Sequence, residues 1–400
     1  MTERADSFRA RSLMGALAFF MALLTSNSHG SENLTIGYLE LSSDPRYEEK
    51  RSYARIRVRD HQRPFVGAEL ALQDARVPSE LLGVAIQLEK YAGSTADELE
   101  RAVRSAHLIG INLFLVDLPT AEITALSQRV GDIDVHFFNV SESDNRLRSA
   151  GCLGNVFHVI PSDAMRTDAL AQHLITKRWS RILILEGPAD EDIRLADSFV
   201  QSARKYGLKV VARRLFSMGK DPRQRHQNNI PLMTSEGRYD IVFIADVEGE
   251  FGRYVPYQTS DPTPVIGTEG LTASGWHWTW ERHGAPQLNQ RFEDYAGRRM
   301  VAADWAAWAA LRALVEAMVR TRSRDVATLI DYLGSDELTM DGYKGNPLSF
   351  RSWNRQLRQP VFLHTHNAVI DRAPLAGFLH REENLDTLGF ERAESACPEK

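Results

Sequence analysis

Short apolar runs alternate with amphipathic stretches along most of the chain. Residues 34–41 (LTIGYLEL) have the pattern of a strand, and residues 64–76 (PFVGAELALQDAR) have the pattern of a helix with a proline in its first turn. The alternation continues with expected strands at 84–91, 111–118 and 134–140 and expected helices at 94–109 and 120–130. Strands and helices that alternate in this way predict a parallel sheet with helices on both faces.

A second series of the same kind follows. The expected strands are 155–160, 181–187, 209–216, 240–247 and 264–268, and the expected helices are 163–178 and 191–206. We therefore expect two doubly wound α/β units in tandem, separated near residues 141–155. The longest helical pattern covers 298–320, and its apolar residues at helical spacing are typical of core packing.

The N-terminus has the pattern of a secretory signal peptide. Arg4, Arg9 and Arg11 precede an uncharged and largely apolar run over 13–24, and small and polar residues follow it. That run is shorter than the roughly 20 residues that a membrane-spanning helix needs, although a permanent anchor is the alternative. We expect residues 1–30 to be removed on export, leaving a periplasmic protein with no stable membrane insertion.

Export also changes the interpretation of the two cysteines, Cys152 and Cys397. An even pair in an oxidising compartment favours a disulfide, and two separate thiols are the alternative. A bond between them would tie the C-terminus to the middle of the chain.

Composition narrows the class of function. The 400 residues are 43% hydrophobic and 25% charged, which is typical of a globular protein with room for two cores, and the net charge of -5 argues against a nucleic-acid partner. The sequence contains no nucleophile elbow, zinc-binding helix or phosphate loop. We expect no catalysis, no cofactor and no metal.

Export, two tandem α/β units and a late helix with returning strands resemble the type I periplasmic binding proteins, especially the branched-chain amino-acid branch that serves ABC importers. The stretch GAELALQDA (67–75) resembles the first helix of that family. The resemblance implies two Rossmann-like lobes, a hinge of about three crossovers, and a ligand held between the lobes at the carboxyl ends of the strands. The expected division is a first lobe of 31–150 plus 270–335, a second lobe of 151–269 plus 336–372, and a C-terminal extension of 373–400.

Three long motifs carry a narrower resemblance. They are ALAQHLITKRWSRILILEGP (169–188), DIVFIADVEGEFGRY (240–254) and KGNPLSFRSWNRQLRQP (344–360), and they are similar to substrate-binding proteins found with PQQ-dependent alcohol dehydrogenase systems. This resemblance implies an ABC transporter permease as partner and an alcohol-derived compound, an amino-acid-like compound or the quinone cofactor as ligand. A non-transporting sensor or carrier of the same fold is the alternative, and a periplasmic enzyme is a further one.

Loops that follow the strands supply the candidates for ligand contact. They are Arg46, Tyr47, Asp117, Pro119, Asn139 and Ser141 in the first lobe and Glu186, Asp246, Glu248 and Glu269 in the second. Asp117 would repel a carboxylate and Pro119 has no amide hydrogen to donate, so this loop argues against an ordinary α-amino acid. Arg46 and Tyr47 suit an anionic or aromatic ligand instead.

The stretch 274–280 (SGWHWTW) places three of the seven tryptophans within five residues. In an extended segment Trp276, Trp278 and Trp280 would share one face. That face packs into a core or hinge, or it presents at least one ring to the ligand, with Trp276 as the best candidate for stacking.

Overall fold

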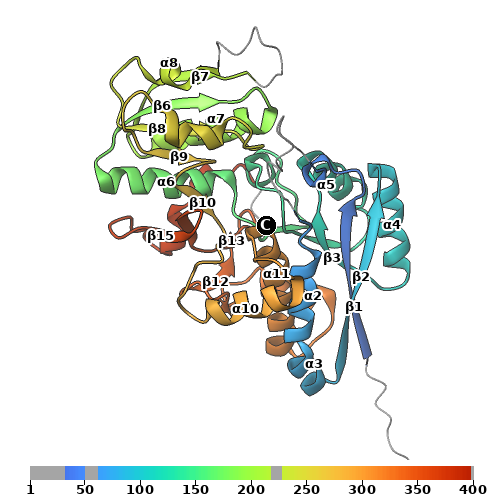
Figure 1. Ribbon diagram of the computed structural model, residues 1–400. Helices are drawn as coiled ribbons and strands as arrows, with labels where there is room; N and C mark the ends of the chain where they lie inside the picture. The colour runs from blue at the N-terminus through green and yellow to red at the C-terminus, as the bar shows by residue number, and fades with distance from the viewer. Residues whose placement is uncertain (1–31, 50–61, 218–227, 398–400) are drawn as a thin grey trace, which may run out of the picture.

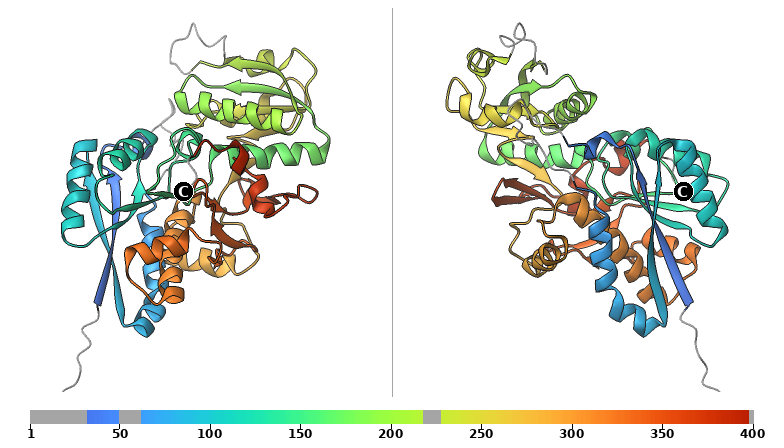
Figure 2. Two further views of the ribbon diagram at one scale, coloured as in Figure 1. Left: turned by 180° about the vertical axis from the view of Figure 1, so that it is seen from behind. Right: turned by 45° about the vertical axis from the view of Figure 1, so that its right-hand side comes forward.

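The computed structural model describes residues 32–49, 62–217 and 228–397, and it consists of two α/β lobes (Figure 1). The signal peptide expected over residues 1–30 lies outside the described residues. The two lobes remain distinct when the molecule is seen from behind and when it is turned by 45° (Figure 2). This architecture confirms the expectation of two Rossmann-like lobes.

The first lobe contains a five-stranded parallel sheet in the order β2-β1-β3-β4-β5. Its strands are β1 (Glu32–Leu41), β2 (Val84–Gly93), β3 (Leu113–Asp117), β4 (His136–Asn139) and β5 (Val156–His158). Because β1 lies between β2 and β3, the direction of winding reverses between β1 and β3. A crevice forms at such a switch point, outside the carboxyl ends of the strands.

Helices cover both faces of this sheet. One face packs against α4 (Ala96–Leu108) and α5 (Thr120–Arg129). The other packs against α2 (Phe65–Asp74) and α11 (Ala302–Thr321), the long late helix. A Cβ atom on Gly67 would lie 2.1 Å from the carbonyl oxygen of Asp304, so α2 and α11 approach this closely because residue 67 is glycine. The helices α3 (Arg76–Leu82), α10 (Ala285–Ala296) and α12 (Val326–Leu333) complete this side.

The second lobe contains a four-stranded parallel sheet in the order β7-β6-β8-β9. Its strands are β6 (Arg181–Glu186), β7 (Lys209–Leu215), β8 (Ile241–Ala245) and β9 (Val265–Gly267). On one face lie α6 (Asp163–Lys177) and α7 (Asp190–Lys205), and on the other lie the short helices α8 (Ile230–Thr234) and α9 (Val255–Gln258). The switch point of this sheet lies between β6 and β8.

One expected strand belongs to the other lobe. The sequence pattern places residues 155–160 at the start of the second unit, but β5 pairs with β4 in the first sheet. The ring of Phe157 stacks on that of Phe138, with centroids 5.2 Å apart, so the fifth strand extends the first core. The chain enters the second lobe only after β5, at α6.

A small antiparallel sheet connects the two cores. It contains β10 (Thr272–Ser274), β14 (Val361–Thr365) and β15 (Ala368–Ala373) in the order β10-β14-β15. Val361 and Leu363 pack into the second-lobe core, whereas Phe362, between them, packs into the first-lobe core. A second small sheet, of β11 (Met340–Asp341), β12 (Pro347–Phe350) and β13 (Leu357–Arg358), adds to the first core.

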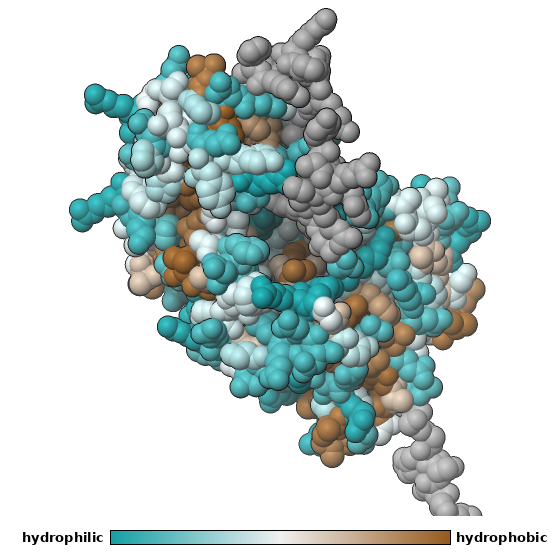
Figure 3. All heavy atoms as spheres, viewed as in Figure 1, coloured by the Kyte–Doolittle hydropathy of each residue, from teal (hydrophilic) through white to brown (hydrophobic). Residues whose placement is uncertain are grey.

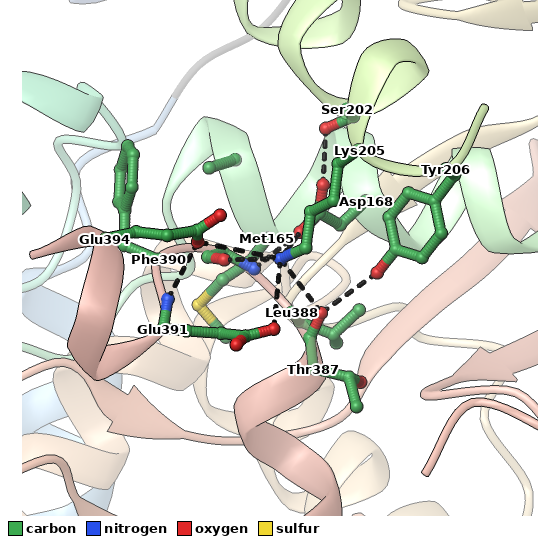
Figure 4. A network of polar contacts seen from close by, with 12 residues as sticks. Met165, Asp168, Ser202, Lys205, Tyr206, Thr387, Leu388, Phe390, Glu391 and Glu394 are labelled. Atoms are coloured by element: carbon green, nitrogen blue, oxygen red, sulfur yellow. Dashed lines mark hydrogen bonds and ion pairs between the residues drawn. The ribbon is translucent and has the colours of Figure 1, made fainter. Parts of the chain in front are cut away.

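The C-terminal segment docks on the second lobe (Figure 4). Lys205 on α7 pairs with Asp168 on α6 at 3.1 Å and donates a hydrogen bond to the Gly389 carbonyl oxygen at 2.9 Å. Beyond that contact, a disulfide joins Cys397 to Cys152, which lies in the loop between β4 and β5. The bond therefore attaches a segment held by the second lobe to a loop of the first.

Candidate functional site

A cavity of about 350 Å³ lies between the two lobes. The first lobe contributes the loops after β1 and β4, and the second contributes the N-terminal ends of α6 and α7 and the loop after β8. The described residues that line it are Pro45, Arg46, Tyr47, Glu48, Ser141, Glu142, Ser143, Asp163, Arg166, Glu191, Arg194, Leu195, Val247 and Glu248. The surface is hollowed between the lobes (Figure 3), and we call this space the interlobe cavity.

Arg46 is fixed by the protein itself. It lies in a short 3₁₀ turn, Pro45–Tyr47, which begins after Asp44. The Nη2 atom of Arg46 lies 2.7 Å from Oδ2 of Asp44, and its Nη1 atom donates to the hydroxyl of Ser141 at 3.3 Å. Because Asp44 already supplies a carboxylate, Arg46 is a weaker receptor for an anionic ligand than the sequence alone indicates.

Asp117 is buried behind the cavity wall and holds Tyr47, which lines the cavity. Its side chain is fully buried and accepts hydrogen bonds from the hydroxyls of Tyr47 at 2.7 Å and Tyr38 at 3.2 Å, and from Arg63 at 3.2 Å. Burial and the neighbouring Asp117 carboxylate raise the pKa of Tyr47 far above its usual range, so Tyr47 stays a hydrogen-bond donor. Asp117 therefore positions Tyr47 and does not line the cavity, contrary to the expectation of a ligand contact.

Asn139 shapes the second first-lobe loop. Its Oδ1 atom accepts from the backbone amides of Ser141 at 3.3 Å and Glu142 at 2.9 Å, and its Nδ2 atom donates to the Glu142 carbonyl oxygen at 2.8 Å. The side chain is buried at the end of β4 and is not part of the cavity wall. It holds Ser141 and Glu142 where they line the cavity.

The second lobe presents the first turn of α6. The hydroxyl of Ser162 accepts from the Met165 amide at 3.1 Å and thereby caps the helix. Asp163 and Arg166 then form an ion pair of 3.0 Å on the cavity side. Burial, opposed by Arg166, raises the pKa of Asp163 from 3.8 to about 6.

Two contacts join the lobes directly beside the cavity. The amide of Asp163 donates to the Ser143 carbonyl oxygen at 2.8 Å, and Nε of Arg194 lies 3.3 Å from Oδ2 of Asp144. Arg194 lies on α7 of the second lobe, and Asp144 follows β4 of the first. The contact is therefore an ion pair across the cavity rim.

Of the expected second-lobe contacts, Glu248 lines the cavity. Glu186 is paired with Arg213 at 2.5 Å. Asp246 accepts from the backbone amides of Gly249, Phe251 and Gly252 at 2.6 to 2.9 Å and so shapes the loop after β8. Glu269 is half-buried in the turn after β9 and does not line the cavity.

Two further expected contacts are also placed elsewhere. Pro119 precedes the first residue of α5 and is absent from the cavity wall. Trp276 is 2% exposed and stacks on Trp305 in the first-lobe core, with ring centroids 5.9 Å apart. Its Nε1 atom donates to Asn289 at 2.9 Å, so a core position and a satisfied indole explain the correction.

The segment around Trp276 is not extended beyond Ser274. The strand β10 ends there, and a turn follows in which the Trp280 amide donates to the His277 carbonyl oxygen at 3.0 Å. The turn separates Trp278 from the other two rings. Trp276 and Trp280 are buried in the first-lobe core and both contact Phe362, whereas Trp278 is partly exposed with the Arg299 guanidinium 3.4 Å from its ring centroid. The expectation of one shared tryptophan face is therefore wrong.

Several cavity residues were missed by reasoning from strand ends alone. Glu142, Asp163, Arg166, Glu191 and Arg194 line the cavity, and the last four lie near the N-terminal ends of α6 and α7. In a parallel α/β unit, a helix that follows a strand begins at the carboxyl edge of the sheet. The sequence predicts helices that begin at residues 163 and 191. Applying this rule to those two helix starts would have identified the cavity residues on α6 and α7.

Within residues 32–49, 62–217 and 228–397, no three histidine, cysteine, aspartate or glutamate side chains are grouped so that they could hold a metal ion. None of the helices in these same ranges combines the length and apolar character that crossing a bilayer requires.

No family model and no curated protein matches the sequence. Solved structures do match the fold. An ABC transporter substrate-binding protein from Sphaerobacter thermophilus aligns with a TM-score of 0.70 and 15% identity, over 90% of this chain and 100% of that chain. A branched-chain amino-acid ABC transporter periplasmic ligand-binding protein from Burkholderia xenovorans LB400 aligns with a TM-score of 0.65 and 13% identity, over 82% and 89%.

A third solved structure contains a bound ligand. A solute-binding protein of an ABC transporter from Rhodopseudomonas palustris BisB5, in complex with 3,4-dihydroxy benzoic acid, aligns with a TM-score of 0.58 and 11% identity, over 83% of this chain and 93% of that one. At these identities the similarity establishes the type I periplasmic binding protein fold.

Proposed function

We propose that this protein is a periplasmic substrate-binding protein that captures a small ligand in the interlobe cavity and delivers it to an ABC transporter. The observation that carries the proposal is the cavity itself, because both lobes line it with polar side chains at the carboxyl edges of their sheets. Its volume, about 350 Å³, falls within the range of small-molecule sites.

In this proposal, ligand binding is coupled to closure of the two lobes about a hinge. A ligand that contacts Tyr47 and Ser141 on one side and Arg166 and Glu248 on the other stabilises the arrangement in which the lobes are close together. A permease that recognises the closed form then distinguishes loaded from empty protein. The proposal assigns no catalytic step to the cavity.

The charges of the wall favour a small ligand with hydroxyl or amine groups. Arg46, Arg166 and Arg194 each lie beside a carboxylate of the protein. A ligand with several carboxylates, such as the quinone cofactor, would have to displace those partners. An alcohol needs no such displacement, and an amino-acid-like compound or the acid product of an alcohol, each with one carboxylate, would compete for only one of these arginines. The proposed link to a PQQ-dependent alcohol oxidation system makes alcohols and their acid products the first compounds to test.

Tyr47 is the aromatic group of the cavity wall in place of Trp276. Its hydroxyl is held by Asp117, and the Arg63 guanidinium lies 4.4 Å from its ring centroid. The ring contributes to the apolar part of the wall together with Leu195 and Val247. Such a ring suits a flat ligand. The dihydroxybenzoic acid in the Rhodopseudomonas protein is a ligand of this shape, so aromatic acids and alcohols belong among the compounds to be screened.

A ligand screen on the refolded mature protein tests the proposal. A compound present at 100 times its dissociation constant adds about 2.7 kcal/mol to the free energy of unfolding. Tyr47→Ala should weaken the best compound, whereas Tyr257→Ala, at a position 87% exposed outside the cavity, should not. The proposal is contradicted if no small polar compound stabilises the protein, or if Tyr47→Ala leaves the affinity unchanged.

A further inference from the structure

A second pocket lies between α10 and the turn that carries Trp278 and Trp280. Its volume is about 290 Å³, and its lining shares no residue with that cavity. The described residues that line it are Trp278, Trp280, Glu281, Pro286, Asn289, Gln290, Glu293 and Asp294. We call it the tryptophan pocket.

The wall on the α10 side is one face of a helix. Residues 286, 289, 290, 293 and 294 have the spacing i, i+3, i+4, i+7 and i+8, which places them in one stripe. Pro286 lies in the first turn, where a proline is tolerated. The stripe presents amide and carboxylate groups to the turn that carries Trp278 and Trp280.

Partly buried hydrogen bonds hold that turn against α10 and the neighbouring chain. Asn289 accepts from Nε1 of Trp276 at 2.9 Å and donates to the Trp278 carbonyl oxygen at 2.9 Å. Nε1 of Trp280 donates to the Tyr343 carbonyl oxygen at 3.0 Å. The ring of Trp280 and the backbone that carries Trp278 are therefore held in place before any ligand arrives, which lowers the entropic cost of binding there.

The charge of the pocket has one sign. Glu281, Glu293 and Asp294 line it, no lysine or arginine does, and within the described chain none of the three carboxylates has a side-chain partner. Nearby arginines on the same stretch are already engaged: Arg291 pairs with Asp74 at 2.7 Å, and Arg298 donates to Asp304 at 2.7 Å.

The contacts of Trp278 show that an indole ring of this pocket can hold a cation. The guanidinium of Arg299 already lies 3.4 Å from the centroid of Trp278, although Arg299 does not line the pocket. Indole is the aromatic group that attracts cations most strongly, and aromatic rings together with carboxylates recognise organic ammonium groups. Metal ions are a poor fit, because the described residues offer no grouping of metal ligands here.

We propose that the tryptophan pocket is a binding site for a small organic cation, with a guanidinium or alkylammonium group against the two indole rings and the carboxylates of Glu293 and Asp294. This site is separate from the interlobe cavity and does not depend on the function proposed for it.

Calorimetric titration of agmatine, a guanidinium-bearing amine, into the mature protein tests the site. We expect saturable binding that weakens as salt is added, because screening acts on exposed charges. The double variant Glu293→Gln/Asp294→Asn should weaken binding about tenfold, and Trp278→Leu should also weaken it, whereas Trp278→Phe keeps a ring and most of the affinity.

Two control variants locate the site. Asp336→Asn/Glu337→Gln removes the same charge from two consecutive exposed acidic residues that do not line the pocket, and it should leave binding unchanged. Glu142→Gln/Glu191→Gln changes the interlobe cavity and should also have no effect. The proposal fails if agmatine gives no saturable heat, if the loss is equal in a control variant, or if Glu293→Gln/Asp294→Asn binds like the unaltered protein.

Discussion

The carboxylate of Asp144 in the first lobe lies 3.3 Å from Nε of Arg194 in the second lobe, at the rim of the interlobe cavity. Asp144 is almost fully buried and also pairs with Arg146, so its position is set by the first lobe whether or not Arg194 is present. The side chain of Arg194 is about one-third exposed, so the contact can break without burying an unpaired charge.

Arg194→Met should therefore loosen the lobes without unfolding either of them. We expect a loss of less than about 1 kcal/mol in the free energy of unfolding, as for other exposed ion pairs, and a larger radius of gyration in ligand-free protein. The control is Arg213→Met, which removes a pair inside the second lobe. If both variants have the radius of gyration of the unaltered protein, the Asp144–Arg194 contact does not restrain the lobes.

Asp163 should make the stability depend on pH. Its pKa is raised from 3.8 to about 6 in the folded protein, so the folded state binds this proton more tightly than the unfolded chain does. The contribution is full below the unfolded pKa and is lost as pH rises from about 4 to about 6. Relative to Asp163→Asn, the unaltered protein should lose about 1 to 3 kcal/mol over that window. Urea unfolding at several pH values measures this difference, and a constant difference would refute it.

The disulfide between Cys152 and Cys397 spans 245 residues of sequence. Cross-links that close long loops restrict the unfolded chain most strongly, so we expect Cys152→Ser/Cys397→Ser to lower the free energy of unfolding by about 2 to 5 kcal/mol. Denaturant titration of both proteins, with and without reductant, checks this. Reductant should shift only the unaltered protein, and an identical shift in the double variant would count against the assignment.

Trp276 should behave as a core residue. Trp276→Ala removes a ring that stacks on Trp305 and a hydrogen bond to Asn289, so we expect a loss of about 3 to 5 kcal/mol. The milder Trp276→Phe should fold and should bind the best cavity ligand with unchanged affinity. If a folded Trp276→Phe protein binds the ligand more weakly, Trp276 contributes to the ligand site and the core assignment is wrong.

The sequence was sufficient for the strands of the two parallel sheets, for most of the long helices that cover them and for the two-lobed fold, because strand and helix periodicity persists through both lobes. It misplaced β5, since a strand at the end of one unit has the same pattern as one at the start of the next. The pairing is decided by contacts such as Phe157 with Phe138, which are distant in the sequence.

The cavity was predicted less completely for a related reason. Arg46, Tyr47, Ser141 and Glu248 were found from strand ends, but a strand end does not show whether a side chain faces a ligand or supports its neighbour. Asp117 is an example, because its role depends on tyrosines and arginines that converge on it in space.

Small-angle X-ray scattering with and without the best ligand of the interlobe cavity tests the central claim most directly. We predict that saturating ligand lowers the radius of gyration, because the lobes close over the cavity, and that Tyr47→Ala prevents the change at the same ligand concentration. Stoichiometric binding with an unchanged scattering profile would contradict the account.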